Sequence, residues 1–206
     1  MPITKRIQGR STYPSKRIAP RPKNEVQRLQ RHKVALAVVD VQERLLPSIW
    51  EQERLVQNTV RLIQGLTILK RPIFVTEQYP KGLGRTVPQI SQALGGISPM
   101  EKVVFSACGA VGFTQALKKA KIADVVLCGI EAHVCVLQTC LDLIESGFAV
   151  FVVADAVSSR TEQNYLIALE RMQNAGAVIA STEMVLFELL GKAGTAEFRQ
   201  ILPIVK

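Results

Sequence analysis

The sequence predicts a three-layer α/β/α domain, in which helices cover both faces of a central, mostly parallel sheet of six strands. Two observations lead to this prediction. Short apolar segments rich in β-branched residues alternate along the chain with longer segments whose apolar residues recur at helical spacing. The apolar segments are continuous, as in parallel strands that are buried on both faces. Strands that alternate with helices in this way form βαβ units, whose strands lie parallel in one sheet.

Six segments are predicted as strands. The first reads VALAVV and contains no polar residue, so both of its faces are expected to be buried. The others are shorter apolar runs, and most of them are followed by a polar residue or a glycine. The predicted strands are residues 34–39, 72–76, 103–105, 125–128, 149–153 and 177–180.

Five segments are predicted as helices from their apolar spacing. Gly147 and Gly176 follow two of them, at the position where helices commonly end. Ser181 or Thr182 can cap the last one. The segment around residues 82–84 is predicted to be a flexible loop, because its glycines do not stand at a strand–helix junction. The predicted helices are residues 55–69, 110–120, 133–146, 162–174 and 183–190.

The composition fits one globular domain that needs neither disulfides nor metals to fold. The chain has 206 residues, 48% of them hydrophobic, and its four cysteines lack the C-x-x-C spacing of a zinc site or disulfide framework. No apolar run reaches the roughly 18–20 residues of a membrane-spanning helix. Polar and basic residues also interrupt the first 33 positions, where a signal peptide would need an apolar core. We therefore expect a cytoplasmic protein without a membrane span.

The net charge of +9 comes from the N-terminus. Residues 1–33 hold ten basic residues and one acid, whereas residues 34–206 hold 16 of each. We therefore divide the chain into a basic N-terminal extension, residues 1–33, and a charge-balanced domain, residues 34–206. Prolines argue against a continuous helix through most of the extension, so an extended arm is expected. These prolines are Pro2, Pro14, Pro20 and Pro22.

Three interpretations of the extension are open. It could bind nucleic acid or an anionic surface, because clustered Lys and Arg release counterions from polyanions. It could be a transit peptide to an organelle, although its prolines disfavour the amphipathic helix of such peptides. We favour the third, an arm that packs on its own domain or on a neighbouring subunit, because a basic stretch with few aromatic residues is a weak sign of nucleic-acid binding.

Three residues near the predicted strands have side chains suited to chemistry at the carboxyl edge of the sheet, where parallel α/β sheets bind their ligands. Asp40 directly follows the first strand, where burial would make it a proton acceptor near neutral pH. Cys135 lies in the first turn of a predicted helix, where unpaired N–H groups should lower the pKa of its thiol. Lys102, at the start of the third predicted strand, could hold both anions and share protons with them.

Each of these residues also has an ordinary structural interpretation. Asp40 could be the N-cap of the segment that follows it. Cys135 could be a buried, inert cysteine, as we expect for Cys108, Cys128 and Cys140. Lys102 could be a solvated lysine at a strand end. Residue types alone leave both interpretations open.

Other kinds of site find little support. The only histidines are His32, in the basic extension, and His133, two positions before Cys135. No Asp/His cluster or H-x-H spacing exists, so no metal site is expected. A Ser-His-Asp triad lacks its G-x-S-x-G turn, and His133 is badly placed to serve as the base of Cys135. Neither glycine-rich nucleotide motif is present, so no cofactor is expected.

Taken together, these segments resemble the isochorismatase-like (cysteine hydrolase) superfamily, which includes nicotinamidases. The similarity runs from about residue 34 to residue 190, and the motif GIEAHVC at residues 129–135 is the most specific part. Within the superfamily, TEQYPKGLG at residues 76–84 is similar to the isochorismatase domain-containing proteins. The other carriers are VVDVQ at residues 38–42, EKVVFS at 101–106 and VADAVSSR at 153–160.

The resemblance implies a Rossmann-like α/β/α fold and a catalytic triad of Asp40, Lys102 and Cys135. In the family the Asp deprotonates the Cys, the Lys supports the charge and proton traffic, and the Cys attacks an amide carbonyl. The family also has a non-proline cis peptide, which would be Ile130–Glu131 here. That bond would direct the N–H groups of Glu131 and Cys135 at the oxyanion.

The resemblance also shapes our expectations for the substrate. Metal-dependent nicotinamidases have an Asp/His ligand set where this chain has EQY at residues 77–79, which argues against nicotinamide. Isochorismatases cleave a vinyl ether without needing the Cys, so Cys135 favours an amidase-like reaction on a small molecule. A non-enzymatic scaffold and vinyl-ether hydrolysis remain alternatives. We expect Tyr79 and Phe105 as apolar pocket walls, Gln42 as a polar wall, and a homo-oligomer, as is common in the family.

Overall fold

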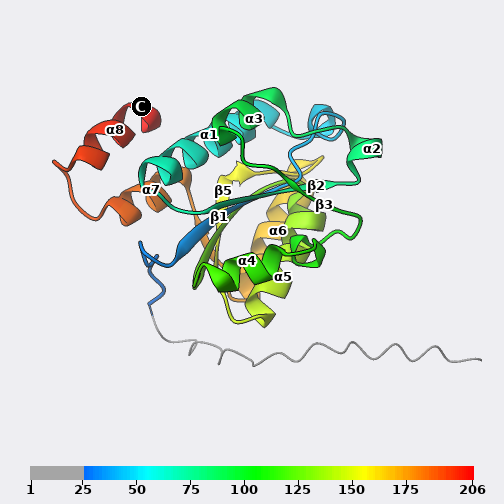
Figure 1. The fold of residues 1–206 in the computed structure, drawn as a ribbon. Helices are drawn as coiled ribbons and strands as arrows, with labels where there is room; N and C mark the ends of the chain where they lie inside the picture. The colour runs from blue at the N-terminus through cyan, green and yellow to red at the C-terminus, as the bar shows by residue number, and fades with distance from the viewer. Residues whose placement is uncertain (1–25) are drawn as a thin grey trace, which may run out of the picture.

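The computed structural model describes residues 26–206 and has a single six-stranded sheet at its centre (Figure 1). All neighbouring strands are parallel, in the order β3-β2-β1-β4-β5-β6. The order reverses between β1 and β4, and ligands of such sheets bind at the carboxyl ends of the strands beside this switch point. The strands are β1 (Val34–Val39), β2 (Ile73–Gln78), β3 (Met100–Lys102), β4 (Asp124–Gly129), β5 (Ala149–Val157) and β6 (Val178–Ala180).

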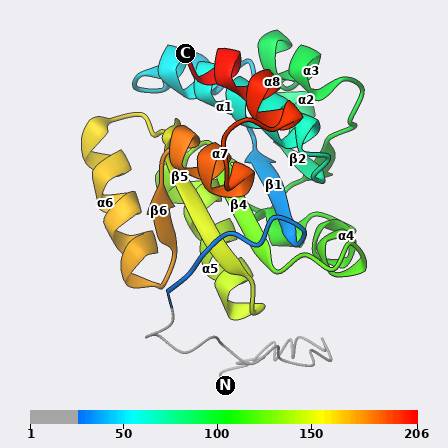
Figure 2. The same ribbon diagram turned by 90° about the vertical axis from the view of Figure 1, so that its left-hand side faces the viewer.

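Two layers of helices enclose the sheet, which confirms the predicted three-layer α/β/α architecture (Figures 1 and 2). One core lies between the sheet and α1, α3, α7 and α8, and the other between the sheet and α4, α5 and α6. The first layer consists of α1 (Gln52–Ile68), α3 (Pro88–Leu94), α7 (Thr182–Leu190) and α8 (Ala196–Val205). The second consists of α4 (Phe113–Lys119), α5 (Leu137–Glu145) and α6 (Glu162–Asn174).

The continuous apolar sequence of β1 follows from these two cores. Leu36 and Val38 face the core beneath α1, whereas Ala37 and Val39 face the core beneath α5. All six residues of β1 are buried. A strand that alternates between two apolar layers has no polar face, which is why its sequence shows no alternation.

The third strand was predicted wrongly. The structure has β3 at Met100–Lys102, and residues 103–105 follow it as an irregular, exposed segment. The apolar run VVF is typical of a strand, which explains the wrong prediction. In the structure its backbone carbonyls accept hydrogen bonds from buried side chains instead of from a neighbouring strand. The correction matters for the site, because Lys102 ends β3 at the carboxyl edge of the sheet instead of beginning a strand.

Other differences concern short or late helices. The predicted flexible loop at residues 82–84 is partly the helical turn α2 (Pro80–Leu83), which ends at Gly84. Helices α3 and α8 were not predicted; α8 uses the apolar residues near the C-terminus to pack against α1 and α7. None of the described helices is long and apolar enough to cross a membrane.

The last residues of the basic extension contact the domain. Leu29 is buried, and its backbone N–H donates to Glu188 on α7. Arg31 forms an ion pair of 3.0 Å with Glu197 on α8. The division of the chain at residue 33 remains a prediction, because residues 1–25 lie outside the described part of the chain.

Candidate active site

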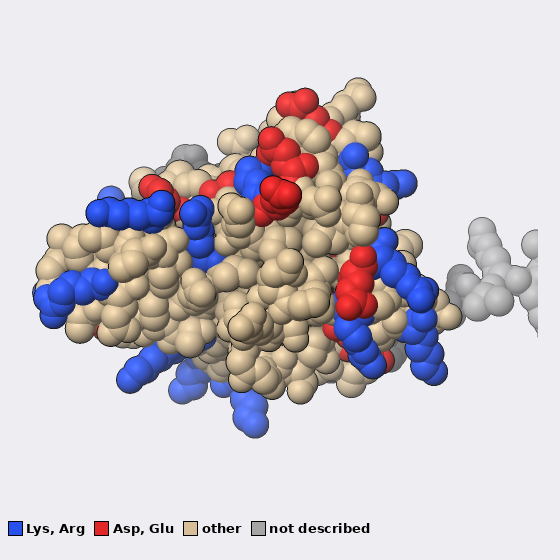
Figure 3. All heavy atoms as spheres, turned by 90° about the horizontal axis from the view of Figure 1, so that it is seen from above, with Lys and Arg blue, Asp and Glu red and all other residues tan. Residues whose placement is uncertain are grey.

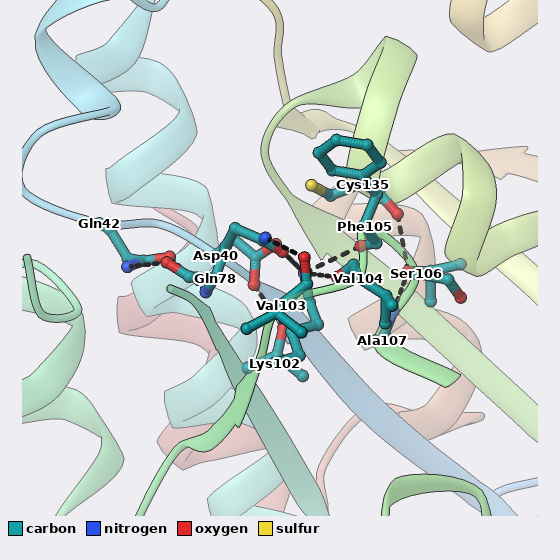
Figure 4. Close-up of polar contacts among 12 residues, drawn as sticks. Asp40, Gln42, Gln78, Lys102, Val103, Val104, Phe105, Ser106, Ala107 and Cys135 are labelled. Atoms are coloured by element: carbon teal, nitrogen blue, oxygen red, sulfur yellow. Dashed lines mark hydrogen bonds and ion pairs between the residues drawn. The ribbon is translucent and has the colours of Figure 1, made fainter. Parts of the chain in front are cut away.

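The three predicted catalytic residues converge at the carboxyl edge of the sheet, beside the switch point (Figure 4). Asp40 follows β1, Lys102 ends β3, and Cys135 lies in a π-helical turn (Ala132–Val136) between β4 and α5. Asp40 and Cys135 are 95 positions apart in the sequence. They share one site because β1 lies between β2 and β4 in the sheet.

Asp40 and Lys102 form a fully buried ion pair. Lys102 Nζ lies 2.5 Å from Asp40 Oδ2, and neither side chain is exposed to solvent. The other carboxylate oxygen of Asp40 accepts a hydrogen bond of 2.7 Å from the Thr76 hydroxyl in β2. Burial raises the pKa of Asp40 above its usual value, while the charge of Lys102 opposes that rise.

Cys135 completes the cluster. Its thiol donates a hydrogen bond to the Asp40 carboxylate, and the backbone N–H of Glu131 donates to the Cys135 sulfur. Thr139, one turn further along, donates from its hydroxyl to the Cys135 carbonyl at 2.7 Å and accepts from the Ala107 backbone N–H at 2.8 Å. These bonds tie the cysteine turn to the segment that follows β3.

The expected lowering of the thiol pKa is contradicted. Burial, together with the negative charge of Asp40, raises the pKa of Cys135 to about 12, although Lys102 opposes the rise. The helix position on which the prediction rested does not outweigh this loss of solvation. Cys135 is therefore a protonated thiol at neutral pH. Burial also raises the pKa of the other free cysteines, to about 11 for Cys108 and about 12 for Cys128 and Cys140.

The turn before Cys135 requires a glycine. Gly129 has φ +118°, and a Cβ at this position would lie 2.1 Å from the Val39 carbonyl oxygen. The peptide bond Ile130–Glu131 that follows is cis. The Glu131 side chain accepts a hydrogen bond of 2.8 Å from Arg160, and His133 Nδ1 lies 2.9 Å from the Ser159 hydroxyl.

The three predicted pocket residues occupy different environments. Gln42 is completely buried, and its side chain forms hydrogen bonds with the backbone N–H and carbonyl of Gln78. It therefore holds the backbone beside the site. Tyr79 and Phe105 are about half exposed. Figure 4 shows the Phe105 ring next to the sulfur of Cys135, while its carbonyl faces Lys102.

Gln78, which is in direct contact with Lys102, was not predicted as a site residue. Its side-chain oxygen accepts from Lys102 Nζ at 2.8 Å. Gln78 follows the predicted end of the second strand, at the edge where ligands bind, but its residue type led to no predicted role. The available signal was the position of Gln78 near the carboxyl end of a strand. Its contact with Lys102 could not be predicted, because that contact depends on the residue at which β3 ends.

Glu77 occupies the neighbouring position in β2. Its carboxylate is buried and accepts from the Thr86 backbone N–H at 2.7 Å, the Thr86 hydroxyl at 2.8 Å and Arg85 at 2.9 Å. Arg85 also pairs with Glu101 at 2.7 Å. Within residues 26–206, no three His, Cys, Asp or Glu side chains are grouped so that they could hold a metal ion.

Comparison with known proteins places the chain in a family. Residues 34–184 match the model of the isochorismatase domain. Isochorismatase domain-containing protein 2A of Mus musculus is 39% identical over 171 residues, which cover 83% of this chain and 82% of the relative.

The solved structures that are similar to this fold include the following two. One is a MAR1 ribonuclease from Caenorhabditis elegans, which is 39% identical and has a TM-score of 0.82 over 87% of this chain and 92% of the other. The second is the YcaC gene product of Escherichia coli, an octameric hydrolase of unknown specificity. It is 26% identical, with a TM-score of 0.80 over 86% of this chain and 90% of the other. These matches show that the chain belongs to the isochorismatase family, which is part of a superfamily of hydrolases.

Proposed function

We propose that this protein is a metal-independent cysteine hydrolase that cleaves a small, non-peptide amide through a thioester on Cys135. The observation that carries the proposal is the contact of the Cys135 thiol with the buried Asp40–Lys102 pair. A nucleophile in contact with a base, which a third group holds in place, is the arrangement expected of covalent catalysis.

The first half of the reaction uses Asp40 as a general base. Because Cys135 holds its proton at neutral pH, Asp40 takes that proton as the sulfur attacks the amide carbonyl. In the resting protein the Glu131 N–H donates to the Cys135 sulfur; once the C–S bond has formed, this N–H and that of Cys135 stabilise the oxyanion. The C–N bond then breaks, and Asp40 returns the proton to the leaving nitrogen, which departs as ammonia or an amine.

The second half restores the free thiol. A water molecule gives one proton to Asp40 and attacks the thioester carbonyl. The C–S bond breaks, the acyl group leaves as a carboxylic acid, and the sulfur recovers a proton from Asp40. The same carboxyl group therefore acts as base and acid in both halves. The burial of Asp40 and Cys135, which is only 6% exposed, favours a small acyl group.

Ammonia release from a panel of small aliphatic and aromatic amides tests the proposal. We expect turnover by the purified chain, a mass increase on the peptide that contains Cys135, and no turnover by Cys135→Ala. The variant Cys140→Ala is the matched control, because it removes a buried thiol outside the site. Hydrolysis that survives in Cys135→Ala would contradict the proposal. An inactive wild type with an unmodified Cys135 would favour the scaffold alternative.

RNA hydrolysis is a second candidate, because the C. elegans relative is a ribonuclease. On the face shown in Figure 3, Lys and Arg side chains stand apart around the outline, with no continuous basic band over the domain. Cleavage of an RNA oligomer that disappears in Asp40→Asn, without any amide turnover, would support this candidate over ours.

We also propose that the chain forms a homo-oligomer in the cytoplasm. The octameric state of the E. coli relative supports the first part. Four described cysteines without a disulfide support a reducing compartment. Light scattering of the purified protein would give the number of subunits, and a mass of one chain would contradict the oligomer.

A further inference from the structure

The ammonium group of Lys102 has all its hydrogen-bonding positions occupied. Three oxygens lie within 3.0 Å of Nζ: Asp40 Oδ2 at 2.5 Å, Gln78 Oε1 at 2.8 Å and the Phe105 carbonyl at 2.9 Å. The Val104 carbonyl lies slightly further away, at 3.3 Å. An ammonium has three N–H donors and no acceptor, so these oxygens match the charged form. A neutral amine would direct its lone pair at one of them.

Gln78 is the residue that fixes this arrangement. Its side-chain oxygen accepts from Lys102, and its side-chain nitrogen donates to the Val103 carbonyl at 2.8 Å. These two bonds allow only one orientation of the amide group. Together, Gln78 and Lys102 bind three consecutive carbonyls, those of Val103, Val104 and Phe105 (Figure 4).

Gln78 is in turn held by Gln42. The Gln42 side chain accepts from the Gln78 backbone N–H at 2.7 Å and donates to the Gln78 carbonyl at 3.0 Å. Hydrogen bonds thus connect Gln42 to Gln78, Gln78 to Lys102, and Lys102 to Asp40. The backbone between residues 40 and 42 closes the ring. Each of these four side chains is at least nine-tenths buried, so water does not compete for these bonds.

We propose that Gln78 is a positioning residue that fixes the Lys102 ammonium as a charged support for Asp40, and that Lys102 transfers no proton during turnover. The proposal deepens the proposed function and departs from the proton-carrying role that the family resemblance suggests for the lysine. Proton transfer is then left to Asp40, whose carboxylate accepts a hydrogen bond from the Cys135 thiol.

The nitrogen NMR signals of the lysine ammonium groups test this proposal without any substrate. An ammonium held by three buried acceptors exchanges protons slowly with water, so Lys102 should give a sharp signal, assigned by its loss in Lys102→Met. We expect that signal at its ammonium position at pH 7. In Gln78→Asn the side chain is too short to reach Nζ, and the exchange rate should rise about tenfold.

The matched control is Gln92→Asn, the same substitution on the exposed surface of α3. It should leave the Lys102 signal unchanged. If Gln78→Asn does not fold, Gln78→Met removes the same hydrogen bonds at nearly constant length. An exchange rate in the folded Gln78 variant equal to that of Gln92→Asn would overturn the positioning role, and a wild-type Lys102 signal outside the ammonium range at pH 7 would overturn the charged form.

A kinetic measurement relates this result to the proposed function. For any amide that the wild type hydrolyses, Gln78→Asn should lower kcat about tenfold and leave KM within about twofold, because Gln78 supports the reacting groups without touching the substrate. A raised KM with an unchanged kcat would contradict the positioning role. Absence of amide turnover in the wild type would defeat the proposed function alone, because the NMR result does not depend on it.

Discussion

The centre and the edge of the sheet hold the residues of the candidate site in different ways. Asp40 follows β1 and Cys135 follows β4. These two strands pair along their whole length and lie between the two apolar cores. Lys102 ends β3, a three-residue strand at the edge of the sheet, and the segment after it is exposed. Backbone pairing and burial position the central residues, whereas hydrogen bonds between side chains position Lys102. The edge should therefore tolerate changes in surface side chains but not the loss of a buried polar partner.

The largest effect on stability is expected from removing the charge at the edge. Lys102→Met leaves the Asp40 carboxylate buried without a counterion, which should lower the free energy of unfolding by about 3–5 kcal/mol. Chemical denaturation at pH 7 measures the difference. The double variant Asp40→Asn, Lys102→Met should recover most of the loss. A single Lys102→Met variant as stable as the wild type would show that the pair is not buried in solution.

The comparison also explains what could be predicted from the sequence. Central strands such as β1 were predicted correctly, because burial on two faces leaves a continuous apolar sequence. At the edge, residues 103–105 have an equally apolar sequence, but their carbonyls are bound by Gln78 and Lys102, so the same pattern gives an exposed segment. Apolar sequence alone does not distinguish these cases.

The candidate site was only partly predictable for a related reason. Asp40, Lys102 and Cys135 could each be named from the sequence, but what brought them together there was the family resemblance. The role of Gln78 depends on β3 ending at Lys102, whereas the sequence pattern predicted a strand at residues 103–105. The thiol pKa was expected to fall because Cys135 begins a helix, but its burial and the charge of Asp40 have the larger effect.

A glycine substitution at the centre is expected to have the next largest effect. Gly129→Ala would place a Cβ against the Val39 carbonyl at a positive φ, and should lower the free energy of unfolding by about 3–4 kcal/mol. Gly176→Ala is the matched control, because Gly176 has φ +107° but nothing within 4 Å of the added Cβ. It should cost only about 1–2 kcal/mol. Equal losses in the two variants would mean that the close approach to Val39 is unimportant.

The smallest effect is expected at the exposed edge segment. Val103 is 76% exposed, so Val103→Ala should change the free energy of unfolding by less than about 0.5 kcal/mol. Val38→Ala, in the buried centre of β1, should cost about 2–3 kcal/mol. Urea titrations of both variants would measure the contrast. A loss at Val103 as large as that at Val38 would indicate that the segment is covered, for example by another subunit.

The central claim is that Cys135 holds its proton at neutral pH and gives it up only to Asp40 during attack. The most direct measurement is the thiolate absorbance of the wild type minus that of Cys135→Ala, followed from pH 5 to pH 10. With a thiol pKa of about 12, the difference spectrum should show no thiolate step in this range. A step at or below the ordinary value of about 8.5 would show a preformed thiolate and contradict the account.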